Sequence, residues 1–201
     1  MSHSTLQQAT QARRSVYALN KTLPLPAAEV IGIVEHALLH SPSAFHSQSS
    51  RAVVLLGAEH DRLWQITAQT LQAALAPEQQ AATAEKMARF QAAAGTVLFF
   101  EDQSVVQGLQ AKYPSYADNF PIWSEQAGAM LQYAIWTALA AAGAGANLQH
   151  YNPLIDEAVA RQWAIPAHWR LRAQLVFGGI AAAPGEKTFA PVAERLKVFG
   201  A

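Results

Sequence analysis

Three adjacent residues near the start of the chain, Arg13, Arg14 and Ser15, have side chains that suit a phosphate group. Two guanidinium groups offer forked cationic donors, the serine adds a hydroxyl, and phosphate oxygens accept such bidentate hydrogen bonds. The alternative is a solvated helix end, where arginine interacts favourably with the negative end of the helix dipole. The triplet by itself leaves both interpretations open.

A second polar stretch, SPSAFHSQ at residues 41–48, supplies hydroxyl and amide groups from its serines and from Gln48. Pro42 keeps this segment from closing into a helix, so its backbone N–H and C=O groups need other partners. The edge of a heteroaromatic ring can supply those partners. An ordinary polar connecting loop is the alternative.

A third stretch, NLQHYNP at residues 147–153, follows Gly143 and Gly145. The two glycines do not make a dinucleotide-binding fingerprint, because a third glycine is missing and the motif follows a helix instead of a strand. Glycine at these positions allows a close approach of the backbone to a ligand. A helix C-cap is the alternative, and the two roles are compatible.

Two cations, Lys187 and Arg195, lie in an otherwise small and apolar C-terminal stretch. They could return to the phosphate that Arg13 binds, or they could be solvated surface charges.

A metal site is a rival interpretation, because His36 and His40 have the i, i+4 spacing that can hold a metal on one helix face, with Glu35 and His46 nearby. Solvated histidines explain the pair as well, and we predict no metal. A hydrolase has no support, since no GxSxG-like nucleophile setting occurs.

The composition limits the classes of function. At 201 residues the chain is long enough for one domain with a full core. Charged residues make up 14%, against about 25% in an average protein, which suggests that a partner subunit covers part of the surface. The net charge is zero and no basic stripe occurs, so nucleic-acid binding is not expected. Because the chain has no cysteine, redox chemistry requires a bound cofactor.

The hydrophobic pattern predicts few strands among many helices, as in a sandwiched α/β or α+β core. Continuous apolar runs predict buried strands at 51–57 and 95–101, and an alternating run predicts a third at 169–177. We expect an aromatic loop at 113–123, a central helix capped by Ser124 and ended by Gly143 and Gly145, and other helices at 3–13, 26–38, 58–75, 78–94, 103–112 and 153–163.

Two observations bear on location. Residues 127–146 approach the length of a membrane span, but their apolar content is mostly Ala and Gly and Gln132 interrupts it, so we expect a buried central helix and no membrane contact. The first ten residues contain no apolar signal-peptide core. We therefore expect a cytoplasmic protein.

Five stretches in order resemble the nitroreductase family, and most closely its short branch of fungal and bacterial oxidoreductases. They are RRS, PSAFHSQSSR, LFFED, YADNFPIWSEQ and LQHYNPLIDEAV, and the resemblance runs from about residue 10 to 199. It implies one FMN-binding domain over residues 1–201, with a mixed, mainly antiparallel sheet flanked by helices, in a domain-sharing homodimer. It also implies that NADH or NADPH gives a hydride to flavin N5 and that a small-molecule acceptor then takes the electrons.

The resemblance implies roles for individual residues, with the flavin and no side chain carrying the chemistry. The phosphate group is assigned to Arg13, Arg14, Ser15 and Lys187, with Arg195 as a looser match. The ring loop that reaches the flavin from the other subunit contains Pro42, Ser43 and His46, followed by Gln48. The segment beside flavin N5 and O4 contains Gln149 and His150, and the substrate-facing aromatics are Phe120 and Trp123.

Two positions depart from the family pattern. The ring loop has His46 where the family usually has asparagine, and Lys86 is a poor fit to the lysine that many members place near flavin N1 and O2. An FMN carrier or sensor without efficient turnover is therefore an alternative. The sequence leaves open the choice between NADH and NADPH, and the acceptor could be a nitro compound, a quinone or an unsaturated lipid.

Overall fold

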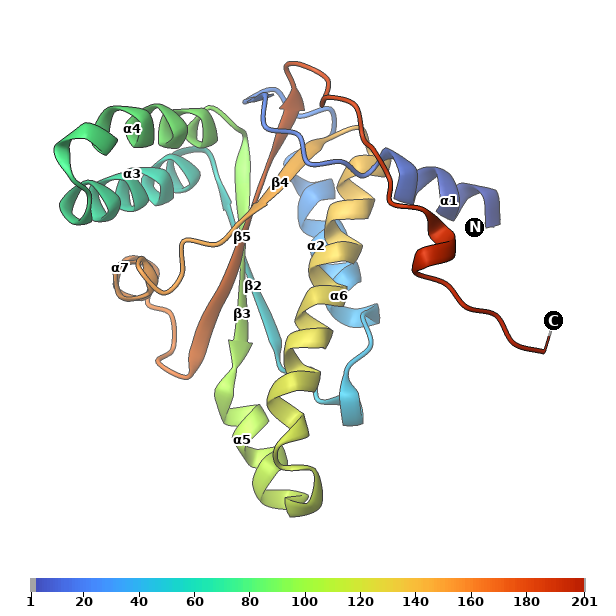
Figure 1. Cartoon of the computed structure of the whole chain (residues 1–201). Helices are drawn as coiled ribbons and strands as arrows, with labels where there is room; N and C mark the ends of the chain where they lie inside the picture. Colours follow the sequence, from blue (N-terminus) through green and yellow to red (C-terminus); the bar gives the residue numbers. More distant parts are fainter. Residues whose placement is uncertain (1–2, 201) are drawn as a thin grey trace.

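The computed structural model describes residues 3–200, which fold around one antiparallel sheet (Figure 1). Its strands are β1 (Leu19–Asn20), β2 (Ser50–Leu56), β3 (Gly95–Asp102), β4 (Gly145–Gln149) and β5 (Trp169–Ile180). The order is β1-β5-β3-β2, and β4 also pairs with β5. The long strand β5 pairs with β3 through residues 169–177, with β4 through residues 174–178 and with β1 through residues 179–180.

The alternation of side chains along the inner strands divides the core into two layers. On β3, Leu98 and Phe100 belong to one cluster of buried side chains, whereas Val97 and Phe99 belong to the other. All eight residues of β3 are buried, because both faces of the sheet are covered by helices. The predicted strands at 51–57, 95–101 and 169–177 correspond to β2, β3 and β5.

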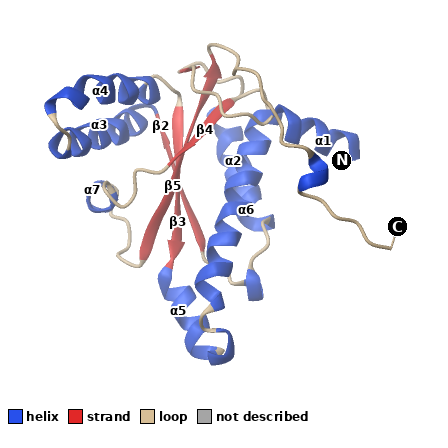
Figure 2. Cartoon of the chain, in the orientation of Figure 1, coloured by secondary structure: helices blue, strands red, loops and turns tan. Residues whose placement is uncertain are grey.

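Helices cover both faces of this sheet (Figure 2). One face carries α3 (Gly57–Ala74), α4 (Pro77–Gln91) and α7 (Asp156–Gln162), and the other carries α2 (Ala27–His40) and α6 (Asn119–Ala141). Helix α1 (His3–Ala12) packs against α6, and α5 (Gln103–Lys112) continues from β3. Short 3₁₀ turns occur at Ala44–His46, Pro114–Tyr116 and Val192–Glu194.

The central helix begins earlier than the sequence predicts. Helix α6 starts at Asn119, so residues 119–123 of the expected loop at 113–123 are helical and Ser124 lies inside the helix. Pro121 occupies the first turn, where a missing N–H leaves no intrahelical hydrogen bond unmade. Ser124 does not cap the helix; its Oγ donates to the Pro121 carbonyl at 2.9 Å.

Strand β4, which the sequence does not predict, begins at Gly145, one of the two glycines expected to end the central helix. Gly145 does not end the helix and does not leave room for a ligand, because a Cβ there would lie 2.7 Å from Leu19 Cδ2 and 2.9 Å from Ile180 Cγ1. Gly143 has a φ of 84° just after the helix end, which agrees with the C-cap alternative.

The expected fold class, a mainly antiparallel sheet flanked by helices, is confirmed. The single domain over residues 1–201 stays a prediction, and residues 1, 2 and 201 lie outside the described part. Among residues 3–200, no helix combines the length and the apolar character that crossing a bilayer requires.

Candidate functional site

The segment with the two arginines is fixed alongside strand β4. Ser15 forms a parallel bridge with Ala146, and the Val16 N–H donates to the Ala146 carbonyl at 2.9 Å. The buried Asn147 amide donates to the Val16 carbonyl at 2.8 Å. These contacts place residues 13–15 beside the strand that leads to Gln149.

Arg13 lies half-buried between the end of α1 and helix α6. Its guanidinium carbon is 4.6 Å from the ring centre of Trp136 and 6.0 Å from that of Tyr133, both on α6. Its Nε is buried and has no hydrogen-bond partner. A buried donor without a partner costs about 1–3 kcal/mol, so this guanidinium suits an incoming acceptor.

Arg14 draws the C-terminal segment to the same place. Its guanidinium donates to the Gly185 carbonyl at 2.7 Å, and Lys187 follows two residues later. Lys187 is exposed, with its Nζ 5.0 Å from the Phe189 ring centre. Arg13, Arg14 and the segment of Lys187 thus form one cationic region, which we name the arginine cluster.

Arg195 lies farther along the chain and makes only a local contact. Its guanidinium donates to the Ala190 carbonyl at 3.2 Å, and its side chain is exposed. Within the described residues, no contact joins it to the arginine cluster.

Strand β4 ends at the segment expected beside flavin N5. The Gln149 side chain is buried, and its amide donates to Asn147 Oδ1 at 2.8 Å, within the same strand. His150 follows and is exposed. Tyr151, next in the chain, packs against the core beneath α3 and α4, and Lys86 Nζ on α4 is 5.6 Å from the Tyr151 ring centre.

The ring loop, residues 41–48, lies at the opposite end of α6 from the arginine cluster (Figure 1). Ser43 Oγ accepts a hydrogen bond from the Gln48 N–H at 3.0 Å, while Pro42, His46 and Gln48 are exposed. A single chain therefore brings the predicted site residues together in two separate groups.

Aromatic side chains surround the ring loop in an arrangement that the sequence did not reveal. The Phe45 ring centre lies 4.9 Å from Tyr113, 5.9 Å from Tyr116, 5.2 Å from Phe120 and 6.1 Å from Trp123. Phe120 is only 2% exposed and lies beneath this aromatic cluster, whereas Phe45 is 49% exposed. An open cavity of about 400 Å³ adjoins it, lined by Pro42, Ser43, Ala44, Phe45, Trp123, Gln126 and Met130.

A larger apolar groove of about 760 Å³ runs between α2 and α6. Its lining includes Ile33, Ala37, Met130, Ala134 and Ala138. The rings of His36 and His40 also border it, with their centres 4.4 Å apart. Within the part of the chain that the structure describes, no third His, Asp or Glu completes a metal site with them.

Similarity to known proteins matches these observations. A sequence profile of the Nitroreductase family covers residues 10–179. Nitroreductase FRM2 of Saccharomyces cerevisiae is 36% identical over 179 residues, which are 88% of this chain and 89% of the yeast protein.

Solved structures show the same likeness. Nitroreductase CinD from Lactococcus lactis, in complex with 4-nitrophenol, is 48% identical with a TM-score of 0.89, over 96% of this chain and 98% of its own. A family structure from Desulfovibrio desulfuricans in complex with FMN is 20% identical, has a TM-score of 0.68 over 96% and 97% of the two chains, and shows likeness of fold. The predicted resemblance is confirmed, and the chain belongs to the nitroreductase family.

Proposed function

We propose that this chain is an FMN-dependent oxidoreductase that takes electrons from NADH or NADPH and passes them to a nitroaromatic compound or a quinone. The family and its relatives support the general oxidoreductase role. The observation that carries the FMN assignment is the arginine cluster, in which the buried Nε of Arg13 has no partner.

The residues of the arginine cluster fit a phosphate group. The guanidinium of Arg13 lies over the Trp136 ring and its buried Nε has no partner, while Arg14 and Lys187 add positive charge from neighbouring segments. Forked guanidinium donors suit the several oxygens of a phosphate. When bound, FMN supplies the two-electron chemistry for which this cysteine-free chain has no side chain.

The acceptor proposal rests on the relatives and on the aromatic cluster. The nitroreductase CinD was solved with 4-nitrophenol and with chloramphenicol. The open cavity beside Phe45 and Trp123 offers flat apolar walls, on which an aromatic acceptor can stack. Trp123 therefore stays the candidate substrate-facing residue, with Phe120 supporting it from beneath.

A homodimer completes the site in this proposal. The ring loop and the arginine cluster lie apart in one chain, so a second copy is needed to supply the loop to the flavin. The C-terminal arm, residues 181–200, supports this idea because its large apolar side chains are exposed, namely Phe189, Val192, Leu196, Val198 and Phe199. The α2–α6 groove offers apolar surface of the kind that subunit interfaces bury.

The same residues support one alternative, an FMN carrier or sensor without efficient turnover. His46 replaces the usual asparagine of the ring loop, and it is exposed with a φ of 51°. The cytoplasmic location expected from the sequence stays a prediction.

An anaerobic absorbance experiment on the purified protein tests the proposal. We expect a flavin band at about 450 nm that bleaches with NADH or NADPH and returns when a nitroaromatic or quinone is added. Bound flavin that does not bleach would favour the carrier alternative. A protein that binds no FMN even after reconstitution contradicts the proposed function.

Two arginine variants test the phosphate assignment. Arg13→Ala removes a guanidinium whose buried Nε has no partner, so we expect FMN to bind at least about tenfold more weakly. Arg89→Ala is the control, because Arg89 is an exposed arginine on α4 that pairs with Glu85 on the same helix. Equal FMN affinities for the two variants would show that Arg13 does not bind the phosphate.

A further inference from the structure

The ring loop contains three residues in a backbone conformation that their side chains disfavour. Phe45, His46 and Gln48 have φ values of 56°, 51° and 48°, in the left-handed region. Residues with a Cβ adopt this region at a cost of about 1–2 kcal/mol each. Contacts with the rest of the molecule must therefore hold the loop in this shape.

Hydrogen bonds inside the loop shape it without attaching it to the sheet. The His46 N–H donates to the Ser43 carbonyl at 3.0 Å, and the Ser47 N–H donates to the Ala44 carbonyl at 3.1 Å. The Gln48 N–H donates to Ser43 Oγ at 3.0 Å. These three amides report on the loop, because each loses its partner if the loop opens.

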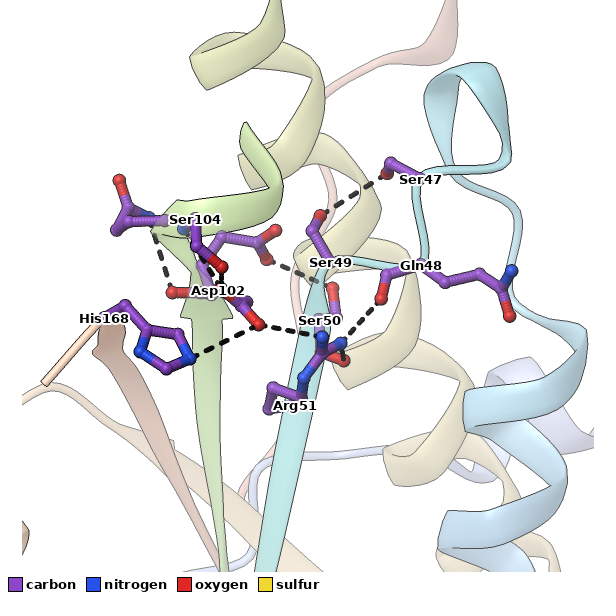
Figure 3. A network of polar contacts seen from close by, with 10 residues as sticks. Ser47, Gln48, Ser49, Ser50, Arg51, Asp102, Ser104 and His168 are labelled. Atoms are coloured by element: carbon purple, nitrogen blue, oxygen red, sulfur yellow. Dashed lines mark hydrogen bonds and ion pairs between the residues drawn. The ribbon is translucent and has the colours of Figure 1, made fainter. Parts of the chain in front are cut away.

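Arg51 of β2 attaches the end of the loop to the sheet, beside a contact of 3.4 Å between Ser47 Oγ and Ser49 Oγ (Figure 3). Its guanidinium donates to the Gln48 carbonyl at 2.6 Å and to the Ser50 carbonyl at 3.1 Å. Both bonds come from Nη1, and because a guanidinium is forked, its second terminal nitrogen can bind another acceptor at the same time, whereas a lysine ammonium is a single point of charge. The Gln48 carbonyl belongs to one of the three left-handed residues.

Arg51 is itself held by strand β3. Its other terminal nitrogen donates to Asp102 Oδ2 at 2.8 Å, and its guanidinium carbon lies 5.6 Å from the Trp169 ring centre. The side chain of Asp102 is 6% exposed, so this ion pair is largely shielded from water. His168 Nε2 lies 3.9 Å from the same carboxylate oxygen.

Asp102 links this attachment to the aromatic cluster. Its Oδ1 accepts hydrogen bonds from the Ser104 N–H at 3.0 Å and from Ser104 Oγ at 2.6 Å, which caps α5. Burial alone would raise the pKa of Asp102, but the hydrogen bonds from Ser104 and the charge of Arg51 outweigh it and lower the pKa. Helix α5 leads to Tyr113, which packs on Phe45.

We propose that Arg51 is a positioning residue that fixes the ring loop for contact with the flavin ring. This inference rests on the proposed function, because the loop meets a flavin only if the chain binds FMN. Arg51 acts through the Gln48 carbonyl, so it belongs neither to the predicted phosphate residues nor to the predicted ring-contacting residues. Without it, the loop is expected to sample open conformations and to bind the flavin less tightly.

The experiment compares Arg51→Ala with Arg172→Ala in the full-length protein. Arg172 is a matched control, because it also lies on a strand, its side chain is 25% exposed against 28% for Arg51, and it forms an ion pair with Glu125. It has no contact with Gln48 among the interactions of the described residues. The measurements are hydrogen exchange of the amides of residues 46–48, the FMN dissociation constant and the midpoint potential of the bound flavin.

We expect Arg51→Ala to speed exchange at these amides, to weaken FMN binding by about tenfold, which corresponds to about 1.4 kcal/mol, and to shift the midpoint potential. Arg172→Ala is expected to leave all three quantities at the parent values. If Arg51→Ala does not fold, Arg51→Lys takes its place, because it keeps a cation beside Asp102 and loses the forked donation. Equal exchange rates in the Arg51 and Arg172 variants would overturn the proposal.

The outcomes separate this inference from the proposed function. A parent protein that binds no FMN contradicts the proposed function, while the exchange rates still decide whether Arg51 holds the loop. A parent that binds FMN and an Arg51→Ala variant with unchanged affinity and potential would refute the positioning role alone.

Discussion

His60 on α3 makes the stability of this protein depend on pH in a specific direction. The ring is 0% exposed, and its Nε2 lies 3.1 Å from the Phe90 carbonyl, which can only accept. Nε2 therefore carries the hydrogen, and Nδ1 accepts from Thr96 Oγ1 at 2.9 Å. The Thr96 hydroxyl in turn accepts from Trp64 Nε1 at 3.1 Å, so a neutral ring satisfies every donor.

The magnitude of the effect follows from the pKa of this ring. Burial lowers the pKa of His60 from 6.5 to about 4, so the unfolded chain takes up a proton at a higher pH than the folded one. The stabilisation is complete above about pH 6.5 and is lost as the pH falls towards about 4. Since each pKa unit corresponds to about 1.4 kcal/mol, the full loss is about 3 kcal/mol, of which about 2 kcal/mol is lost by about pH 5.

The assay is urea unfolding followed by tryptophan fluorescence at about pH 7.5 and about pH 5, at one protein concentration. Other groups titrate in this range, so the informative quantity is the difference between the parent and His60→Gln, which cannot take up the proton. We expect the parent to lose about 2 kcal/mol more than the variant on acidification. Equal losses in the two proteins would refute the neutral, buried His60.

Three further substitutions have defined outcomes. Glu101→Gln removes a carboxyl whose pKa is raised by burial from its usual 4.5. The folded parent therefore loses stability as the pH rises above 4.5 and this carboxyl ionises, whereas the variant does not. In urea unfolding, the variant should become more stable relative to the parent as the pH rises. Gly145→Ala forces a Cβ against Leu19, and we expect a loss of about 1–3 kcal/mol in the same assay. Gly108→Ala is its control, because nothing lies near that position inside α5, and a gain of about 0.5–1 kcal/mol is expected; a loss there would contradict the reasoning.

Two of the main strands, β2 and β3, could be predicted because each corresponds to a continuous apolar run in the sequence. The stretches RAVVLLG and GTVLFFE form β2 and β3 within a residue of the predicted bounds. Strand β3 is buried as predicted, whereas β2 lies at the edge of the sheet and is only partly buried except at Leu55. The start of α6 could not be predicted in the same way. Pro121 and the aromatic residues around it are common in loops, and only the packing of Phe120 under Phe45 shows why they are helical.

Strand β4 was missed because its burial is polar. Asn147 and Gln149 are buried, although a hydrophobic pattern predicts that polar residues are exposed. The Asn147 amide donates to the Val16 carbonyl, and the Gln149 amide donates to Asn147 Oδ1. The partner of Asn147 is 131 residues away in the chain, so no local pattern reveals it. The same limit applies to Arg51 and Asp102, which are 51 residues apart and meet only because β2 and β3 pair.

The candidate site, too, could be predicted from the sequence only in part. The resemblance identified Arg13, Arg14 and Lys187 as one group, and the hydrogen bond from Arg14 to Gly185 does bring their segments together. Their roles towards FMN stay predictions. The aromatic cluster was beyond reach, because Phe45 and Tyr113 come from distant segments and touch only in the folded chain.

The central place of β5 has a consequence for synthesis on the ribosome. Strands β2 and β3 can pair with each other as soon as both have emerged, but the ladders of β4 and β1 are both formed with β5, the last strand to be made. Until residue 180 has left the exit tunnel, β1 cannot pair with β5, although most of the chain is already outside. At about 5–20 residues per second, synthesis from Asn20 to Ile180 takes about 8–32 seconds, during which unpaired strand edges are exposed to other chains.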